Sequence, residues 1–252
     1  MSKFLKVGLE AVEKSGKIIL NYFDKVDIVY KKNKNYRDLV SEIDILSEQS
    51  IIETIKKKYK SHNFLAEESG YQNNNSNYEW VVDPLDGTVN YTRGLKLCSI
   101  SLALRHKNKA ILGIIYNPFF KELFYATKFG AFLNGKKISV SQNKSFDNSL
   151  VISALSSDVS KNNSKQFSKF RKLNNKTLGV LRIGSAAYAL CLLAKGSSDI
   201  FFGNSLKTWD VEAGIFIVKQ AGGVVKKIKK SKNEVDLIAT SCKNLLLKTL
   251  KL

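Results

Sequence analysis

Cysteine is scarce in this sequence, with only Cys98, Cys191 and Cys242 among 252 residues and no CxxC pair. This excludes a disulfide-stabilised scaffold and a cysteine-based metal site, and we expect buried, unreactive thiols. Uninterrupted hydrophobic runs of about 18 residues are also missing, so no transmembrane helix is expected. Glu10 and Glu13 interrupt the apolar pattern near the N-terminus, which favours an amphipathic helix over a signal peptide. We therefore expect a cytoplasmic protein that does not attach to membranes.

Acidic residues are few, because 22 Asp and Glu accompany 41 Lys and Arg, which gives a formal net charge of +19. Such a charge is typical of proteins that bind nucleic acid. However, only 5 of the basic residues are Arg, the residue suited to bidentate phosphate contacts, and 36 Lys and 21 Asn are spread along the chain. A general bias in composition explains this pattern as well as a binding surface does. We keep nucleic-acid binding as an alternative that is not favoured, and we expect the densest lysine cluster, at 226–232, to be a solvated turn.

Hydrophobic residues make up 44% of the chain, enough for a large core, and their spacing changes along the sequence. Helical spacing before residue 60 gives way between 97 and 140 to strand-like segments separated by turn signals, which predicts an antiparallel meander. After about residue 145, helices and strands alternate, which is typical of α/β proteins. The polar stretch 31–38 is predicted to be a loop or a pair of β-turns. We predict two tightly packed parts, an α+β part at 1–145 and an α/β part at 146–252.

These predictions assign individual elements along the chain. The predicted helices are 3–23, 40–59, 164–173, 184–194, 210–221 and 243–252. The predicted strands are 63–66, 80–82, 97–104, 110–116, 122–127, 137–140, 150–153, 200–202, 224–228 and 237–240.

The segment WVVDPLDGT at 80–88 contains the strongest chemical signal. An apolar strand runs into Asp83 and Asp86, two carboxylates three residues apart. Pro84 restricts the residue before it to an extended backbone, and Gly87 permits a turn that other residues adopt only at a cost. Paired carboxylates suit Mg²⁺, and backbone N–H groups beside them suit a phosphate. For this segment alone, an Asx-turn or a calcium-binding turn is the alternative, although the spacing does not match an EF-hand.

Three other acidic segments strengthen this signal. Glu67 and Glu68 end a short apolar strand in FLAEES, and Asp210 stands at the predicted start of a helix in WDVEAG. Asp44 lies in DLVSEID, on a predicted amphipathic helix. Each has a simpler explanation, as a solvated strand end, a helix N-cap or a polar helix position. In a chain with so few acids, their position at the ends of strands and helices favours a shared site.

Together these segments resemble the inositol monophosphatase family of Mg²⁺-dependent phosphomonoesterases. FLAEES, WVVDPLDGTVNY and TWDVEAG occur in the family's order and at its separations, and DLVSEID, GIIYNP, GAFLNGKKISVS, RIGSAAYALCLLAKGSSD and AGGV also match family segments. The resemblance covers about residues 5 to 240. It implies a layered αβαβα sandwich of the α/β (α+β) class, two or three Mg²⁺ ions per site, a homodimer and inhibition by lithium.

The resemblance also implies a role for individual residues. Glu67 matches the carboxylate that binds the activating metal, and Asp83 matches a carboxylate that bridges metals. Glu68 would lie next to these ligands or bind a third metal. Thr88 and Asp44 match the pair that orients and deprotonates the attacking water, so they and Glu67 are the predicted catalytic residues. The predicted metal ligands are Glu67, Asp83, the carbonyl of Leu85, Asp86 and Asp210. The predicted substrate-binding residues are Gly87, Thr88, Gly184, Ser185, Ala186 and Asp210.

The sequence departs from inositol-specific members shortly before its WD motif. Those members carry a Glu about six residues before the Trp, where this chain has Gly203, and Asn204 beside it would contact a hydroxyl with different geometry. We therefore expect Gly203→Glu to shift preference toward inositol phosphate. Histidinol phosphate, adenosine 3′,5′-bisphosphate and fructose bisphosphate stay open as substrates of other family members. His62 and His106 lie outside every motif, and we expect them on the surface or in loops.

The predicted function is Mg²⁺-dependent hydrolysis of a small phosphate monoester, with inositol 1-phosphate first among substrates. Metal-activated water would attack the phosphorus, and no histidine is required. An alternative of another class is an RNA- or transcription-complex-associated factor, because a bacterial branch of the family has such a role. A catalytically inactive scaffold is disfavoured, since clustered carboxylates repel one another without metal.

Overall fold

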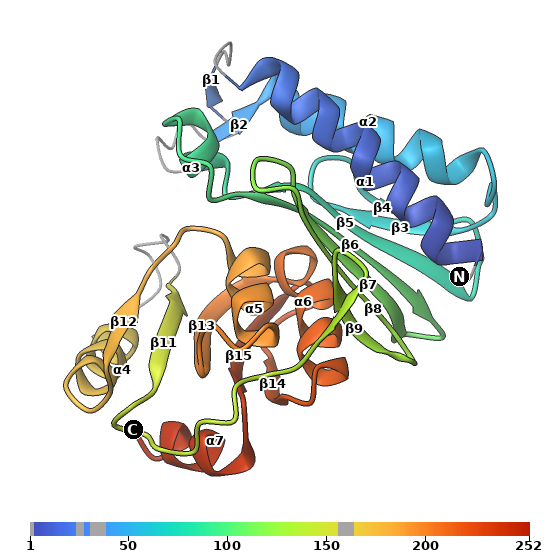
Figure 1. Cartoon of the computed structure of the whole chain (residues 1–252). Coiled ribbons are helices and arrows are strands. Elements are labelled where there is room, and N and C mark those ends of the chain that lie inside the picture. Colours follow the sequence, from blue (N-terminus) through green and yellow to red (C-terminus); the bar gives the residue numbers. More distant parts are fainter. Residues whose placement is uncertain (1–2, 24–27, 31–38, 156–163) are drawn as a thin grey trace.

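The computed structural model describes residues 3–23, 28–30, 39–155 and 164–252. Five layers follow one another, helices, sheet, helices, sheet and helices, which confirms the predicted αβαβα class (Figure 1). The stretch 31–38, predicted as a loop or turns, lies outside the described residues.

The helices are α1 (Lys3–Tyr22), α2 (Glu42–Lys56), α3 (Thr88–Thr92), α4 (Ser164–Asn174), α5 (Ala186–Ala194), α6 (Thr208–Gln220) and α7 (Lys243–Leu250). The strands are β1 (Ile28–Tyr30), β2 (Leu39–Ser41), β3 (Asn63–Ala66), β4 (Gly70–Gln72), β5 (Tyr78–Asp86), β6 (Ser99–His106), β7 (Lys109–Asn117), β8 (Glu122–Thr127), β9 (Gly130–Leu133), β10 (Lys136–Ile138), β11 (Leu150–Ala154), β12 (Gly179–Leu181), β13 (Ile200–Lys207), β14 (Val224–Lys229) and β15 (Glu234–Thr240).

The larger sheet has eight strands in the order β10-β9-β8-β7-β6-β5-β3-β4, and α1 and α2 cover its outer face. Its neighbouring strands are antiparallel except β3 and β5, which run parallel with Ala66 opposite Val82. Parallel strands end at the same edge of a sheet. The residues that follow this pair, Glu67 and Asp83, are therefore brought together by the register of the backbone.

The smaller sheet has five strands in the order β12-β11-β13-β15-β14. One of its faces packs on α5 and α6, and the other packs on α4 and α7 through Leu173 and Leu245. Between β10 and β11 the chain leaves the larger sheet for the smaller one, and the proposed division at 145/146 falls in that connection. However, α6 belongs to the second part by sequence and packs against strands of the first.

Close packing fixes α6 between the two sheets. A Cβ atom at Gly113 of β7 would lie 2.7 Å from the carbonyl oxygen of Ala213 on α6. A Cβ atom at Gly214 of α6 would lie 2.6 Å from the side chain of Leu190 on α5. Glycine at these two positions therefore lets the helix approach its neighbours more closely than any other residue would allow.

A largely buried ion-pair network also connects α6 to both sheets. Arg105 on β6 pairs with Glu79 on β5 at 2.8 Å and with Glu212 on α6 at 2.9 Å. Glu212 pairs in turn with Lys227 on β14 at 2.9 Å, so this member of the lysine cluster predicted as a solvated turn lies in a strand and is paired. Burial alone would raise the pKa of Glu212, but the two cations lower it below its usual value.

His62 was expected on the surface or in a loop, and it lies in the loop between α2 and β3 but not on the surface. His62 is buried, and its Nδ1 accepts a hydrogen bond from the indole N–H of Trp80 at 3.0 Å. Its ring stacks on those of Tyr59 and Tyr78, with centroids 4.6 and 4.9 Å apart. Burial lowers the pKa of His62, which favours the neutral ring that this acceptor role requires. His106, at the end of β6, also stacks on Tyr78.

The expectation of buried thiols is right for two of the three cysteines. Cys98 and Cys191 are buried, whereas Cys242 is partly exposed, and all three are free thiols. Burial raises the pKa of Cys98 to about 12, which keeps the unreactive thiol form at neutral pH. Among the described residues, no helix is long and apolar enough to cross a membrane.

Strands β1, β2, β4, β9 and β12 and the short helix α3 were not predicted, and three helices begin elsewhere than expected. The helix predicted from 210 begins at Thr208, the helix predicted from 184 begins at Ala186, and the helix predicted from 40 begins at Glu42. Each unpredicted strand has at most four residues, too few for an alternating pattern to stand out from its surroundings.

We predict that Gly113→Ala destabilises the protein by about 1–3 kcal/mol, because the added methyl group forces α6 away from β7. Chemical denaturation of both proteins would measure this change in the free energy of unfolding. Gly135→Ala is the control, since its φ of +81° carries a backbone cost but no atom lies within 4 Å of the new Cβ. A Gly113→Ala variant as stable as the wild type would contradict the proposed close packing.

Candidate active site

The site begins where β5 loses its regular register between Asp83 and Asp86. Asp83 is buried, and its Oδ1 accepts a hydrogen bond from the N–H of Leu85 at 3.0 Å. Gly87 follows with a φ of +102°, and a Cβ there would lie 3.0 Å from the carbonyl oxygen of Leu97. This turn needs glycine both for its backbone angle and for space. It directs Asp83 and Asp86 toward one end of the sheet and starts α3 at the next residue.

Asp44 and Thr88, predicted as a pair, lie within hydrogen-bonding distance. The Thr88 hydroxyl lies 3.1 Å from Oδ1 of Asp44 and 3.1 Å from the carbonyl oxygen of Leu85, and it can donate to either. Asp44 is buried on the face of α2 that packs against the sheet. Ser47, on the same face, donates to the carbonyl oxygen of Pro84 at 3.0 Å. These contacts fix α2 relative to the turn, and they make a hydrogen-bonded pair of a carboxylate and an alcohol.

Glu67 and Glu68 follow β3 directly, as predicted. The N–H of Glu67 donates to the carbonyl oxygen of Val82 at 3.2 Å, which extends the pairing with β5 by one residue. The buried carboxylate of Glu48 accepts hydrogen bonds from the N–H groups of Glu68 and Ser69, both at 2.8 Å. Glu48 therefore fixes the backbone on which both glutamates are carried. Glu48 was not among the predicted site residues.

The position of Glu48 relative to Asp44 in the sequence could have predicted its buried contact. It lies four residues after Asp44 on α2, so both side chains point to the same face of the helix. That face also carries the apolar residues that contact the sheet, such as Ile51 and Ile55. Two acids at this spacing on a buried face are not explained by solvation and indicate a polar contact inside the fold.

Asp86 points at the N-terminus of α5. Its Oδ2 accepts hydrogen bonds from the Ser185 hydroxyl and from the N–H of Ala187, both at 2.6 Å. Burial raises the pKa of Asp86 to about 6, although these hydrogen bonds favour its charged form. The predicted segment Gly184, Ser185 and Ala186 is thus in contact with a predicted metal ligand.

Asn90 holds the chain before α5 in place. Its side-chain amide donates to the carbonyl oxygens of Leu97 and Ile183, at 2.6 and 2.7 Å. A Cβ at Gly184, whose φ is +80°, would lie 2.7 Å from that amide nitrogen. Asn90 was not predicted, because a single Asn on a short helix gives no local indication of a partner about ninety residues away.

Asp210 lies at the third position of α6, so the alternative explanation of it as the helix N-cap does not hold. Its carboxylate accepts a hydrogen bond from the N–H of Lys207, the residue that precedes the helix, at 3.2 Å. This contact closes the first turn of α6 and turns the carboxylate toward the ends of the strands. The Ser101 hydroxyl supports the same turn by donating to the carbonyl oxygen of Trp209 at 3.0 Å.

Four of the predicted metal ligands interact electrostatically. Burial raises the pKa of Asp83 well above its usual value, and so do the charges of Glu67, Asp86 and Asp210. Burial and the charges of Asp86 and Glu67 raise the pKa of Asp210 in the same way. The nearness of the Glu67 side chain thus adds to the burial that raises the pKa of Asp83.

This set of donors fits a hard divalent cation. Carboxylates that repel one another in a partly buried site are stabilised by Mg²⁺, whose preferred ligands are oxygens. Among the described residues, no three acidic, histidine or cysteine side chains are already arranged as a closed metal cage. Bound cations would therefore have to draw these carboxylates inward.

A cavity of about 210 Å³ opens beside Asp86 and Asp210. Its wall includes Ser185, Arg182 and Ser205, so hydroxyl groups and one cation face the space. The register of β13 shifts between Gly203 and Leu206, and Ser205 has a φ of +51° there. This irregularity decides which residues of β13 face the cavity.

The expected role of Gly203 and Asn204 is not supported. Both residues line a different cavity, whereas Ser205 and Leu206 line the one beside the carboxylates. A Cβ at Gly203 would lie 2.7 Å from Leu206 Cδ1 and 2.8 Å from the carbonyl oxygen of Ala154. A glutamate at 203 would have to displace this packing before it reached a substrate, so the predicted gain in preference for inositol phosphate does not follow.

Comparison with known proteins agrees with this geometry. The chain matches the model of the inositol monophosphatase family over residues 1–250. It is 34% identical over 227 residues to "Nus factor SuhB" of Pasteurella multocida (89% of this chain, 85% of that protein). It is 33% identical over 240 residues to "Fructose-1,6-bisphosphatase/inositol-1-monophosphatase" of Aquifex aeolicus (95% and 91%). The crystal structure of extragenic suppressor protein suhB from Bartonella henselae superposes with a TM-score of 0.90 at 29% identity (99% and 98%). The chain, with its acidic cluster and αβαβα fold, belongs to the inositol monophosphatase family.

Proposed function

We propose that this protein is a Mg²⁺-dependent phosphatase that hydrolyses a small phosphate monoester, with inositol 1-phosphate first among the candidates. The observation that carries the proposal is the hydrogen-bonded pair of Asp44 and Thr88 beside four mutually repelling carboxylates. Membership of the family supports phosphatase chemistry, and members generally use Mg²⁺. A homodimer, expected from the resemblance, stays a prediction.

The residues that would hold two or three Mg²⁺ ions are Glu67, Asp83, the carbonyl of Leu85, Asp86 and Asp210. Bound Mg²⁺ would supply Lewis-acid stabilisation of the phosphate charge and a lowered pKa for a bound water. Glu48, Ser185 and the N–H of Ala187 orient the ligand-bearing backbone and Asp86 through the hydrogen bonds described above. Glu68, next to Glu67, would support the same ligands.

Asp44 and Thr88 would move the proton. The attacking water would give its proton to Thr88 Oγ while the Thr88 hydroxyl gives its own to Asp44, the acceptor 3.1 Å away. The N–H groups of Gly87 and Thr88 would bind phosphate oxygens, since the first N–H groups of a helix have no partner within the helix. Gly184, Ser185, Ala186 and Asp210 would contact the alcohol part of the substrate.

A second candidate function is association with a transcription complex. It is favoured by the similarity to proteins named Nus factor SuhB and by the net charge of +19. Such a role would use the surface and would not need the acidic cluster. The two functions can therefore be separated by a variant that lacks a metal ligand.

We expect phosphate release from one ester of a panel to be much faster than from the others, and only with Mg²⁺. The panel is inositol 1-phosphate, histidinol phosphate, adenosine 3′,5′-bisphosphate and fructose 1,6-bisphosphate, each with Mg²⁺ or with a chelator. Rapid hydrolysis of another ester would correct the substrate and keep the chemistry. No Mg²⁺-dependent hydrolysis of any ester would contradict the phosphatase proposal, and salt-dependent RNA binding would then favour the second candidate.

We predict that Asp210→Asn lowers kcat by about a hundredfold or more, because loss of a ligand removes several kcal/mol of metal-dependent stabilisation. The same change should stabilise the metal-free protein at pH 8, because it removes a carboxylate whose pKa is raised by burial and by the charges of Asp86 and Glu67. A carboxylate whose pKa is raised in the folded state binds protons more tightly there than in the unfolded chain. The carboxylate therefore begins to destabilise the fold as the pH rises above its pKa in the unfolded chain. The destabilisation grows until the pH passes its pKa in the folded protein, and is complete above that pH.

Activity assays and thermal unfolding without metal, at pH 5 and pH 8, would test both expectations. Glu53→Gln is the matched control, since Glu53 is an exposed carboxylate on α2, outside the cluster. The stabilisation should be larger at pH 8 than at pH 5 and absent in the control. Unchanged activity of Asp210→Asn would refute its assignment as a ligand.

Thr88→Val should lower kcat by about 10²–10⁴-fold with little change in KM, because it removes the hydroxyl that passes the proton and keeps the shape of the side chain. Thr88→Ser keeps the hydroxyl and should retain most of the activity. Steady-state kinetics of the three proteins would measure the difference. Equal activity in the Val and Ser variants would show that the hydroxyl is not needed.

A further inference from the structure

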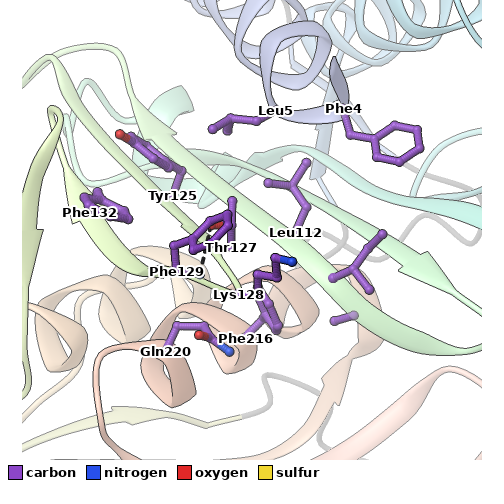
Figure 2. A pocket seen from close by; sticks show the side chains of 12 residues that line it. Phe4, Leu5, Leu112, Tyr125, Thr127, Lys128, Phe129, Phe132, Phe216 and Gln220 are labelled. Carbon is purple, nitrogen blue, oxygen red and sulfur yellow. Dashed lines mark hydrogen bonds between the residues drawn. The ribbon is translucent and has the colours of Figure 1, made fainter. Parts of the chain in front are cut away.

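A large apolar cavity lies at the end of the eight-stranded sheet opposite the acidic cluster. Its volume is about 590 Å³, and its lining comes from α1, β7, β8, β9 and α6 (Figure 2). Asp86 of β5 pairs near Ser99, at the start of β6, whereas the cavity adjoins the first residues of β7 and the last of β8. The length of the strands therefore separates the two sites, and the phosphatase proposal makes no use of this one.

The cavity lies where β7 extends beyond the end of β8. Pairing of the two strands stops at Gly113 opposite Ala126, although β7 begins four residues earlier at Lys109. Strand β8 ends at Thr127, which pairs with Gly130 of β9, and the N–H of Phe129 in the turn between them donates to the Thr127 hydroxyl at 3.2 Å. Within the described residues, the edge of β7 at 110–112 therefore has no paired strand on this side, and these residues line the cavity.

The wall is rich in aromatic rings. Figure 2 shows Tyr125, Phe129 and Phe132 around the turn, with Phe4 on α1 to one side and Phe216 on α6 to the other. Phe129 has 74% of its surface exposed, which is costly for a phenyl ring that could otherwise be buried. A volume of this size lies within the range of about 300–1,000 Å³ typical of small-molecule sites. The lining favours a ligand whose main part is apolar or aromatic.

Charge limits the ligand further. Among the described residues that line the cavity, Lys128 is the only charged one, and none of them is acidic. Lys128 is exposed, and its ammonium lies 5.1 Å from the centroid of the Phe129 ring, at the open side of the site. A ligand that placed an anionic group there would meet an uncompensated cation while its apolar part lay against the rings.

We propose that this cavity is a second binding site, which takes a small amphipathic anion with an apolar or aromatic body and one carboxylate or sulfonate end. The proposal is independent of the phosphatase function. It rests on the start of β7 that extends past the end of β8, the aromatic wall and the exposed lysine that lines the cavity.

Titration of the full chain with anilinonaphthalene sulfonate, followed by its fluorescence, tests the proposal. We expect one saturable site per chain. Ala110→Trp places an indole in the cavity from the free edge of β7 and should abolish saturable binding. Lys128→Gln should weaken binding up to about fivefold, since an exposed charge pair is worth at most about 1 kcal/mol.

Matched controls separate this site from general surface binding. Phe167→Ala removes a ring that is 59% exposed on α4, away from the cavity, and Lys136→Gln removes an exposed charge on β10. Both should bind the dye like the wild type. Circular dichroism and thermal unfolding would establish that Ala110→Trp is folded, and its phosphatase activity should equal that of the wild type.

Competition then tests the ligand class. Decanoate should displace the dye at lower concentration than decanol, and this difference should vanish in Lys128→Gln. Dye binding to folded Ala110→Trp equal to that of the wild type would overturn the proposed site. Equal competition by decanoate and decanol in the wild type would overturn the anionic class. Dimers that form through this face and exclude the dye would show that a second copy of the chain is its occupant.

Discussion

Repulsion between carboxylates is the constraint to which the rest of this structure responds. Glu67, Asp83, Asp86 and Asp210 come from three separate segments, and burial together with their charges raises the pKa values of Asp83 and Asp210. A chain gains nothing from collecting such groups unless a cation compensates them. The fold nevertheless holds them with two parallel strand ends, a buried glutamate on α2 and the first turns of α5 and α6.

The same contacts orient the segments that carry these carboxylates before any metal binds. Asp86 is oriented by a hydroxyl and an N–H group, and Asp210 by the N–H that precedes its helix. Asp44 is placed by α2, which is joined to the turn through Ser47. The support thus comes from hydrogen bonds between side chains and backbone groups, made largely by residues other than the carboxylates. This separation of support from chemistry is consistent with a family whose relatives carry names for different roles while sharing one fold.

Most of the fold and the acidic residues could be predicted from the sequence, because periodicity and the ends of apolar strands are local signals. Glu67, Asp83 and Asp86 each follow or end such a strand, and the structure places them together. Residues whose partners are distant could not be found in this way. Glu48 and Asn90 bind backbone groups of other segments, and His62 accepts from Trp80, contacts that exist only after the sheet has formed. The expectation that residue 203 faces the substrate is not supported for another reason. The register of β13 shifts between Gly203 and Leu206, so Ser205 and Leu206 line the cavity beside Asp86 and Asp210.

The position of α6 has a consequence for how the chain can be divided. This helix is encoded in the second half, yet it lies against the first sheet at Gly113 and brings Asp210 to carboxylates of the first half. A polypeptide that stopped before β11 would keep Glu67, Asp83 and Asp86 but would expose the sheet face that α6 covers. Neither half could be transplanted, duplicated or lost as an independent module. Genetic rearrangement would therefore have to conserve the chain as one unit, and two separately expressed halves would regain the cluster only by reassociating across that helix.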